Sequence, residues 1–247
     1  MVSNRNDRAE DRELLSFPTL PVLVLIVLAG VLTAFMLWDG NKIEDDAFVF
    51  FRYADNFLAG HGLTWNPGDD LVEGYTSVIY TLLLIVLRSP GSDPVAVVHA
   101  LNGLLFVATI LASARFSHLM CGATPSRMFL VAPLLVATSS PMAMWARNGM
   151  ETMLFALLVV ACLIAAQTKS ELRSWLIGVG MLFGFTVLTR PEGILLCLAV
   201  VALRLHTSFR ESNPNPLRRE VWMIGGLVGV VGPHLLCRLS YYGEWLP

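Results

Sequence analysis

Two long stretches without a charged residue constrain this chain most strongly. Leu20–Trp38 is a charge-free run of 19 residues, and Val221–Cys237 is a second run without an acidic or basic residue apart from His234. A helix needs about 20 apolar residues to cross the hydrocarbon core of a bilayer. Charged residues make up 15% of the chain, whereas soluble domains contain about 25%. We therefore predict an all-α, polytopic membrane protein.

The pattern of apolar segments predicts about seven transmembrane helices. The predicted spans are 19–38, 95–116, 127–144, 149–168, 174–189, 191–206 and 221–240. Thr76–Leu87 is also apolar, but its 12 residues are too few to cross a bilayer. We expect it to lie in the membrane interface as a juxtamembrane helix. Residues 1–18 form a predicted cytoplasmic tail, and residues 19–247 form one transmembrane module.

Basic residues indicate how these helices are oriented. Lys and Arg favour the cytoplasmic side of short loops. If Thr76–Leu87 does not cross, loops 117–126, 169–173 and 207–220 lie on the same side as the N-terminus. These loops contain or adjoin Arg115, Arg127, Lys169, Arg173, Arg204, Arg210, Arg218 and Arg219. The N-terminus is thus predicted to be cytoplasmic and residues 39–94 to form the first extracytoplasmic loop. A net charge of −2 without a basic run argues against nucleic-acid binding.

Two adjacent acids, Asp45 and Asp46, stand before a predicted amphipathic helix at Ala47–Leu58 in that loop. Adjacent carboxylates repel each other, so one of them can keep a proton more strongly and act as a general base on a hydroxyl. Binding of a divalent metal ion that bridges to a phosphate is an equally physical use, with Asp46 and Glu73 as ligands. The structural alternative is that the pair only caps the helix.

Two charged turns interrupt the later apolar segments. In 189–193, Pro191 ends one helix, and Arg190 and Glu192 flank it. In 147–151, Arg147 and Glu151 precede another apolar span. Charges at membrane depth are costly, so they indicate function by default. The alternatives are an Arg–Glu pair that closes a hairpin and a carboxylate that favours a helix start.

Several motifs, in this order, resemble a known family. They are Asp45-Asp46-Ala47-Phe48, Phe51-Arg52-Tyr53-Ala54, Gly60-His61-Gly62-Leu63, Trp65-Asn66-Pro67-Gly68, Glu73-Gly74-Tyr75-Thr76-Ser77, Gly149-Met150-Glu151-Thr152, Leu188-Thr189-Arg190-Pro191-Glu192-Gly193 and Tyr241-Tyr242-Gly243. Together they resemble the GT-C-type polyprenyl-phosphate-dependent glycosyltransferases, and most closely the branch with the terminal arabinofuranosyltransferases of actinobacterial cell walls. Members of this family are usually longer, so we expect this chain to correspond to an N-terminal part.

The resemblance implies a membrane enzyme of cell-envelope glycan assembly with its active face outside the cytoplasm. The donor would be a polyprenyl-phosphate sugar and the acceptor a hydroxyl of a glycan, lipid or protein. Asp45 or Asp46 would be the base, and arginines would neutralise the departing phosphate. Apart from the divalent metal ion, no cofactor is expected. The predicted substrate-binding residues are Arg52, Tyr53, His61, Glu73, Arg147, Glu151, Arg190 and Glu192.

Two other classes of function stay open at this point. A transporter or lipid flippase would also place charges in a membrane cavity, but it predicts an internal repeat and charges near the bilayer midplane. The sequence shows no repeat, and its acids gather on one predicted face. A non-catalytic fragment or partner subunit is the third alternative.

Overall fold

The computed structural model describes residues 19–37, 43–88, 91–121, 127–167, 172–210 and 217–244. The predicted cytoplasmic tail, residues 1–18, lies outside these ranges. Within them every regular element is helical, as predicted. The elements are α2 (Thr19–Leu37), α3 (Ala47–Leu58), α4 (Val78–Leu87), α5 (Pro94–Cys121), η1 (Arg127–Leu130), α6 (Val131–Ala137), α7 (Ser140–Trp145), α8 (Thr152–Gln167), α9 (Arg173–Thr189), α10 (Gly193–Arg210) and α11 (Leu217–Tyr242).

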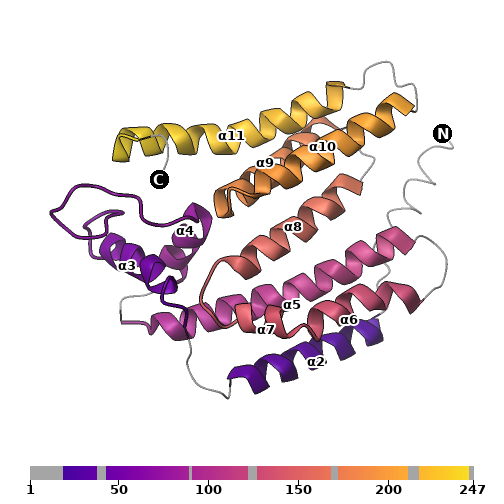
Figure 1. Cartoon of the computed structure of the whole chain (residues 1–247), viewed down its shortest axis with the longest axis horizontal. Helices are drawn as coiled ribbons and strands as arrows, with labels where there is room; N and C mark the ends of the chain where they lie inside the picture. The colour runs from indigo at the N-terminus through magenta and orange to yellow at the C-terminus, as the bar shows by residue number, and fades with distance from the viewer. Residues whose placement is uncertain are drawn as a thin grey trace.

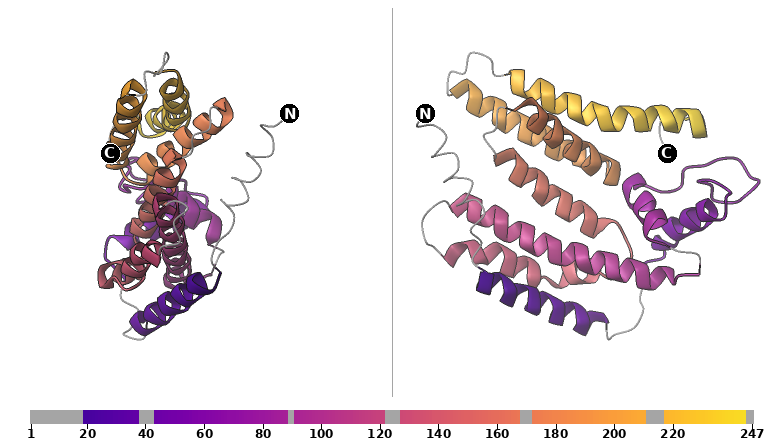
Figure 2. Two further views of the ribbon diagram at one scale, coloured as in Figure 1. Left: turned by 90° about the vertical axis from the view of Figure 1, so that its right-hand side faces the viewer. Right: turned by 180° about the vertical axis from the view of Figure 1, so that it is seen from behind.

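The long helices run roughly side by side in an elongated bundle (Figures 1 and 2). Helix α11 packs along α9, and α5 packs along α8. The short helices α3 and α4 lie together at one end of the bundle (Figure 1). The turn before α8, the turn between α9 and α10, and the last residues of α11 lie at this same end. Segments far apart in the sequence therefore meet around the first loop.

Three helices in the described ranges are long and apolar enough to cross a membrane. They are Pro94–Cys121, Gly193–Arg210 and Arg219–Tyr242. Shorter apolar helices occur at Val78–Leu87, Met128–Ala137, Thr152–Gln167 and Arg173–Thr189. The helical class is thus confirmed, whereas the number of seven spans and their orientation stay predictions.

The two helices predicted in the first loop are present. The amphipathic segment Ala47–Leu58 is helix α3 with the predicted bounds, and its buried side chains include Phe50 and Tyr53. The juxtamembrane segment forms α4, whose 10 residues are too few to cross a bilayer. Phe50 contacts Tyr80 of α4 edge to face, with ring centroids 5.2 Å apart. This contact holds the two short helices together as one unit.

The span predicted at 127–144 is not one continuous helix. It is divided into η1, α6 and α7, with a break at Thr138 and Ser139. The hydroxyl of Ser139 accepts a hydrogen bond from the backbone N–H of Met142, which starts a new helix. Pro141 lies in the first turn of α7, where its missing N–H costs little, but inside one long helix it would remove a hydrogen bond. Average hydropathy did not reveal this break.

Candidate functional site

The start of α3 is attached to the turn that precedes α8. The backbone N–H of Glu44 donates to the carbonyl of Asn148 at 3.0 Å. The amide Nδ2 of Asn148 donates back to Oε2 of Glu44 at 3.3 Å. The acid pair of the first loop is therefore held next to the later charged turn.

Gly149 allows this close approach. Its φ is +78°, a left-handed conformation that favours glycine, and a Cβ there would lie 3.0 Å from Cβ of Ala47. The Tyr80 hydroxyl donates to the Gly149 carbonyl at 3.0 Å, and Nδ2 of Asn102 donates to the carbonyl of Met150 at 3.0 Å. Side chains from α4 and α5 thus fix the turn that carries Glu151.

Glu151 is buried, and it faces the turn between α9 and α10. Its Oε1 lies 3.8 Å from Nε of Arg190, while Nη2 of Arg190 lies 3.5 Å from Oε1 of Glu192. Glu151 is 2% exposed, and within the described residues its Oε2 has no hydrogen-bond partner. Buried acceptors are nearly always paired, so an unpaired one marks a place where a ligand or water can bind.

Asp45 and Asp46 are both exposed in the turn before α3. Asp46 occupies the N-cap position, but its side chain accepts no capping hydrogen bond. The structure therefore does not show the Asp46 side chain capping the helix, which was the structural alternative for this residue. Asp46 and Glu151 are near enough for their charges to repel each other. Asp46, Glu151, Arg190 and Glu192 thus form one charged site at the end of the bundle.

The other predicted binding residues of the first loop shape the loop itself. Nε of Arg52 donates to the carbonyl of Trp65 at 2.9 Å, and its Nη2 donates to Oδ1 of Asn66 at 3.0 Å. The Tyr53 hydroxyl donates to the Val72 carbonyl at 2.6 Å and accepts from the N–H of Gly74 at 2.8 Å. His61 is exposed.

Arg147 is 8% exposed and lies in the turn before α8. It is thus buried in the same turn that carries Gly149 and Glu151.

Glu73 has a partner that sequence reasoning missed. Its Oε2 lies 2.8 Å from Nε of Arg238 in α11, and both side chains are buried. The two atoms are not aligned as a hydrogen bond, so the contact is electrostatic. Burial raises the pKa of the Glu73 carboxyl, and the charge of Arg238 opposes that rise. No signal in the local sequence links these two distant residues.

A metal centre is not assembled in the described part of the chain. There, no three His, Cys, Asp or Glu side chains lie close enough together to hold an ion. Glu73 faces Arg238 rather than a second carboxylate. Metal binding by Asp46 and Glu73 therefore stays a prediction from the sequence.

The two tyrosines at the end of α11 bind the first loop. The Tyr242 hydroxyl donates to the carbonyl of Leu63 at 2.9 Å, and the N–H of Leu63 donates to the Tyr241 hydroxyl at 3.0 Å. The Tyr75 hydroxyl lies 3.3 Å from that of Tyr242, and burial raises the pKa of Tyr75 to about 12. The Tyr-Tyr-Gly motif was visible in the sequence, but its contact with the loop was not.

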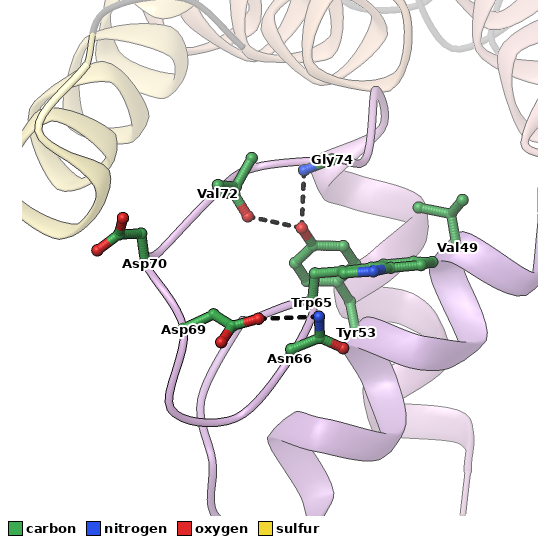
Figure 3. A pocket seen from close by; sticks show the side chains of 8 residues that line it. All are labelled: Val49, Tyr53, Trp65, Asn66, Asp69, Asp70, Val72 and Gly74. Atoms are coloured by element: carbon green, nitrogen blue, oxygen red, sulfur yellow. Dashed lines mark hydrogen bonds between the residues drawn. The ribbon is translucent and has the colours of Figure 1, made fainter.

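The first loop also contains a pocket that the sequence did not indicate. Its volume is about 490 Å³, and Figure 3 shows the side chains around it. The lining residues are Val49, Tyr53, Trp65, Asn66, Asp69, Asp70, Val72 and Gly74. The charged site before α3 and this pocket thus share helix α3.

A helical bundle in which three helices are long and apolar enough to cross a bilayer indicates an integral membrane protein. Residues 76–234 match the family of dolichyl-phosphate-mannose-protein mannosyltransferases, and the chain belongs to that family. It is also similar to the terminal beta-(1->2)-arabinofuranosyltransferase of Mycobacterium tuberculosis, with 24% identity over 242 residues. That similarity covers 90% of this chain and 36% of the relative, so the chain spans about a third of the relative's length. No solved structure matches the chain.

Proposed function

We propose that this chain forms part of a glycosyltransferase that moves a sugar from a polyprenyl-phosphate donor to an acceptor hydroxyl. The observation that carries the proposal is the position of Arg190. Its side chain is 37% exposed and lies beside two carboxylates, at the end of the bundle where Asp45 and Asp46 are also exposed. A cation for phosphate and a base for a hydroxyl are the two groups that this transfer needs.

In the proposed reaction, Asp46 or Asp45 takes the proton of the acceptor hydroxyl. The hydroxyl oxygen attacks the anomeric carbon, and the bond between that carbon and the phosphate oxygen breaks. The electron pair of the broken bond stays on the lipid phosphate. Arg190 neutralises the added negative charge, since a guanidinium matches phosphate geometry. Attack opposite to the leaving group inverts the anomeric configuration.

Glu151 has two roles in this proposal. Its Oε1 positions the Arg190 guanidinium. The guanidinium also lies over the ring of Phe155, with 5.9 Å between Cζ of Arg190 and the ring centroid. Its unpaired Oε2 has almost no exposed surface, so it can accept a hydrogen bond from a sugar hydroxyl only if the side chains that cover it move. Removal of Glu151 would therefore affect both the placement of Arg190 and the binding of the sugar.

The sequence pattern and the family support the following membrane setting for the proposed reaction. The acidic end of the bundle faces outward from the plasma membrane, and the basic loops face the cytoplasm. The donor then reaches the site from the outer leaflet. The acceptor is a glycan, lipid or protein of the cell envelope, and the arabinofuranosyltransferase similarity supports a glycan.

The test is a transfer assay with a radiolabelled polyprenyl-phosphate sugar and the protein in lipid nanodiscs. Asp46→Asn or Asp45→Asn should lower kcat by about 100-fold or more, because general-base catalysis contributes that much. Arg190→Gln should also lower kcat, and Arg190→Lys should restore only part of it. Glu244→Gln changes an exposed carboxylate near the end of α11 and serves as the control.

Wild-type transfer by both aspartate variants would show that the base assignment is wrong. Flux of the lipid sugar across the bilayer without transfer would support the transporter alternative. The absence of both transfer and flux would support a non-catalytic role.

A further inference from the structure

The pocket in the first loop has a preformed wall. The side chains of Arg52 and Asn56 both donate hydrogen bonds to the carbonyl of Trp65, each at 2.9 Å. Nδ2 of Asn56 also donates to the carbonyl of Thr64 at 2.7 Å. These bonds fix the backbone beneath the indole ring. Because this part of the loop is already ordered, it loses little further conformational entropy when a ligand binds.

Other residues that line the pocket are also held by hydrogen bonds. The Tyr53 hydroxyl bridges the carbonyl of Val72 and the N–H of Gly74, and Figure 3 shows both bonds. Nδ2 of Asn66 donates to Oδ2 of Asp69 at 3.0 Å. The pocket is therefore held by the loop's own bonds.

The groups that line the pocket suit a neutral polyhydroxyl ligand. Trp65 is 43% exposed, and an aromatic face attracts the slightly positive C–H groups of a sugar ring. Asp69 and Asp70 are exposed carboxylates that accept hydrogen bonds from hydroxyls. Asp70 makes no hydrogen bond to any described residue, so its oxygens are open to a ligand.

The same lining disfavours the lipid phosphate of the donor. The pocket is lined by two carboxylates, and none of the described residues that line it is a cation. A phosphate placed there would be repelled by both acids. The phosphate is better placed at Arg190, and the pocket is then left for the other substrate.

The pocket lies next to the proposed base. Asp46, Val49 and Tyr53 are three and then four residues apart, so they fall on the same side of α3. Val49 is one helical turn from Asp46, a rise of roughly 4.5 Å along the axis. A sugar unit on Trp65 can therefore extend toward Asp46.

We infer that this pocket binds a neutral saccharide unit of the acceptor glycan, stacked on Trp65 and hydrogen-bonded to Asp69 and Asp70. The inference rests on the proposed function, because it assigns the pocket to the acceptor of that transfer. It names the acceptor class as a glycan whose bound unit carries no phosphate. Trp65 and Asp70 are positioning and specificity residues in this assignment.

The first test measures binding without transfer. A neutral arabinofuranosyl disaccharide is titrated into the protein in nanodiscs, and saturation-transfer NMR and calorimetry report the Kd. Trp65→Ala should weaken binding by about tenfold, which equals about 1.4 kcal/mol. Trp65→Phe keeps an aromatic face and should retain most of the affinity. Asp70→Asn keeps the shape of the side chain but removes one acceptor oxygen and should weaken binding severalfold.

Trp175 provides the matched control. It is 41% exposed and lies in α9, outside the pocket, so Trp175→Ala should leave the Kd unchanged. Inorganic phosphate should not compete with the disaccharide. Unchanged binding in both Trp65→Ala and Asp70→Asn, or competition by phosphate, would overturn the assignment.

The second test is kinetic and separates this inference from the proposed function. Trp65→Ala should raise the acceptor KM by about tenfold and leave the donor KM near wild type. If the protein transfers sugar but Trp65→Ala does not change the acceptor KM, the pocket assignment fails alone. If Trp65-dependent disaccharide binding occurs without any transfer, the proposed enzyme activity fails and the pocket still binds saccharide.

Discussion

Glu73 of the first loop and Arg238 of the last helix form a buried ion pair, with 2.8 Å between Oε2 and Nε. The pair lies beside Tyr75 and Tyr242, whose hydroxyls are 3.3 Å apart. Together with the bonds of Tyr241 and Tyr242 to Leu63, it joins the loop to α11. The proposed site therefore depends on a contact between the first loop and the last helix.

Replacing Arg238 with Met should destabilise the protein by about 3 kcal/mol near pH 8, because it leaves a buried carboxylate without its counter-charge. The loss should be smaller at pH 5, where Glu73 can take up a proton. Unfolding in detergent, followed by circular dichroism, measures both values. Asp70 is an exposed carboxylate of the same loop, and the free energy of unfolding of Asp70→Asn should stay within about 0.5 kcal/mol of that of the wild type. Equal losses for Arg238→Met at both pH values would contradict the role given to Glu73.

The raised pKa of Glu73 predicts a pH-dependent stability. The folded protein keeps this proton to a higher pH than the unfolded chain, in which the carboxyl titrates near 4.5. The contribution of protonated Glu73 is therefore complete below about pH 4.5 and is lost as pH rises through the raised pKa. Melting temperatures of wild type and Glu73→Gln between pH 4 and 8 should diverge across this window. A constant difference over the whole range would show that Glu73 does not titrate differently on folding.

The two tyrosines of α11 should have separable effects on the first loop. Tyr241→Phe removes the acceptor of the Leu63 N–H, so the Leu63 amide should exchange its hydrogen faster. Tyr242→Phe removes the donor to the Leu63 carbonyl but leaves that N–H bonded. Each variant should cost about 1 kcal/mol of stability. Hydrogen exchange with mass spectrometry distinguishes them, and identical exchange at Leu63 in both variants would argue against the docking described.

Local patterns in the sequence predicted the local structure well. Helix α3 follows from its amphipathic mixture of apolar and polar residues, and the short α4 follows from a 12-residue apolar stretch. The break before α7 was missed because hydropathy averages over Ser139 and Pro141, which act through one hydrogen bond and one ring.

The residue types of the candidate site and the local Arg190–Glu192 pair were predictable from the sequence, but the contacts between distant segments were not, and the roles of these residues stay predictions. Asp46, Glu151 and Arg190 each lie beside a turn or a helix start, where sequence signals are strong. The contact of Glu73 with Arg238 depends on how α11 packs, and no local pattern encodes that. The pocket around Trp65 was missed for a similar reason, since it arises from hydrogen bonds between a helix and a loop.

Gly149 should be intolerant of any side chain. Gly149→Ala places a Cβ 3.0 Å from Ala47 and forces a non-glycine residue to a φ of +78°. Both effects act where the start of α3 meets the turn that carries Glu151. We expect a loss of about 1–3 kcal/mol in stability and a lower rate of transfer. Thermal unfolding and the transfer assay measure the two effects.

Gly178→Ala is the matched control for this prediction. Gly178 is an exposed residue within α9, and a Cβ there would meet nothing within 4 Å. Alanine also favours a helix over glycine by up to about 1 kcal/mol, so this variant should be as stable as wild type or more so. Ala47→Gly combined with Gly149→Ala relieves the Cβ contact but not the backbone strain, and it should restore only part of the transfer rate. Wild-type stability and transfer in Gly149→Ala would show that this close approach does not position the site.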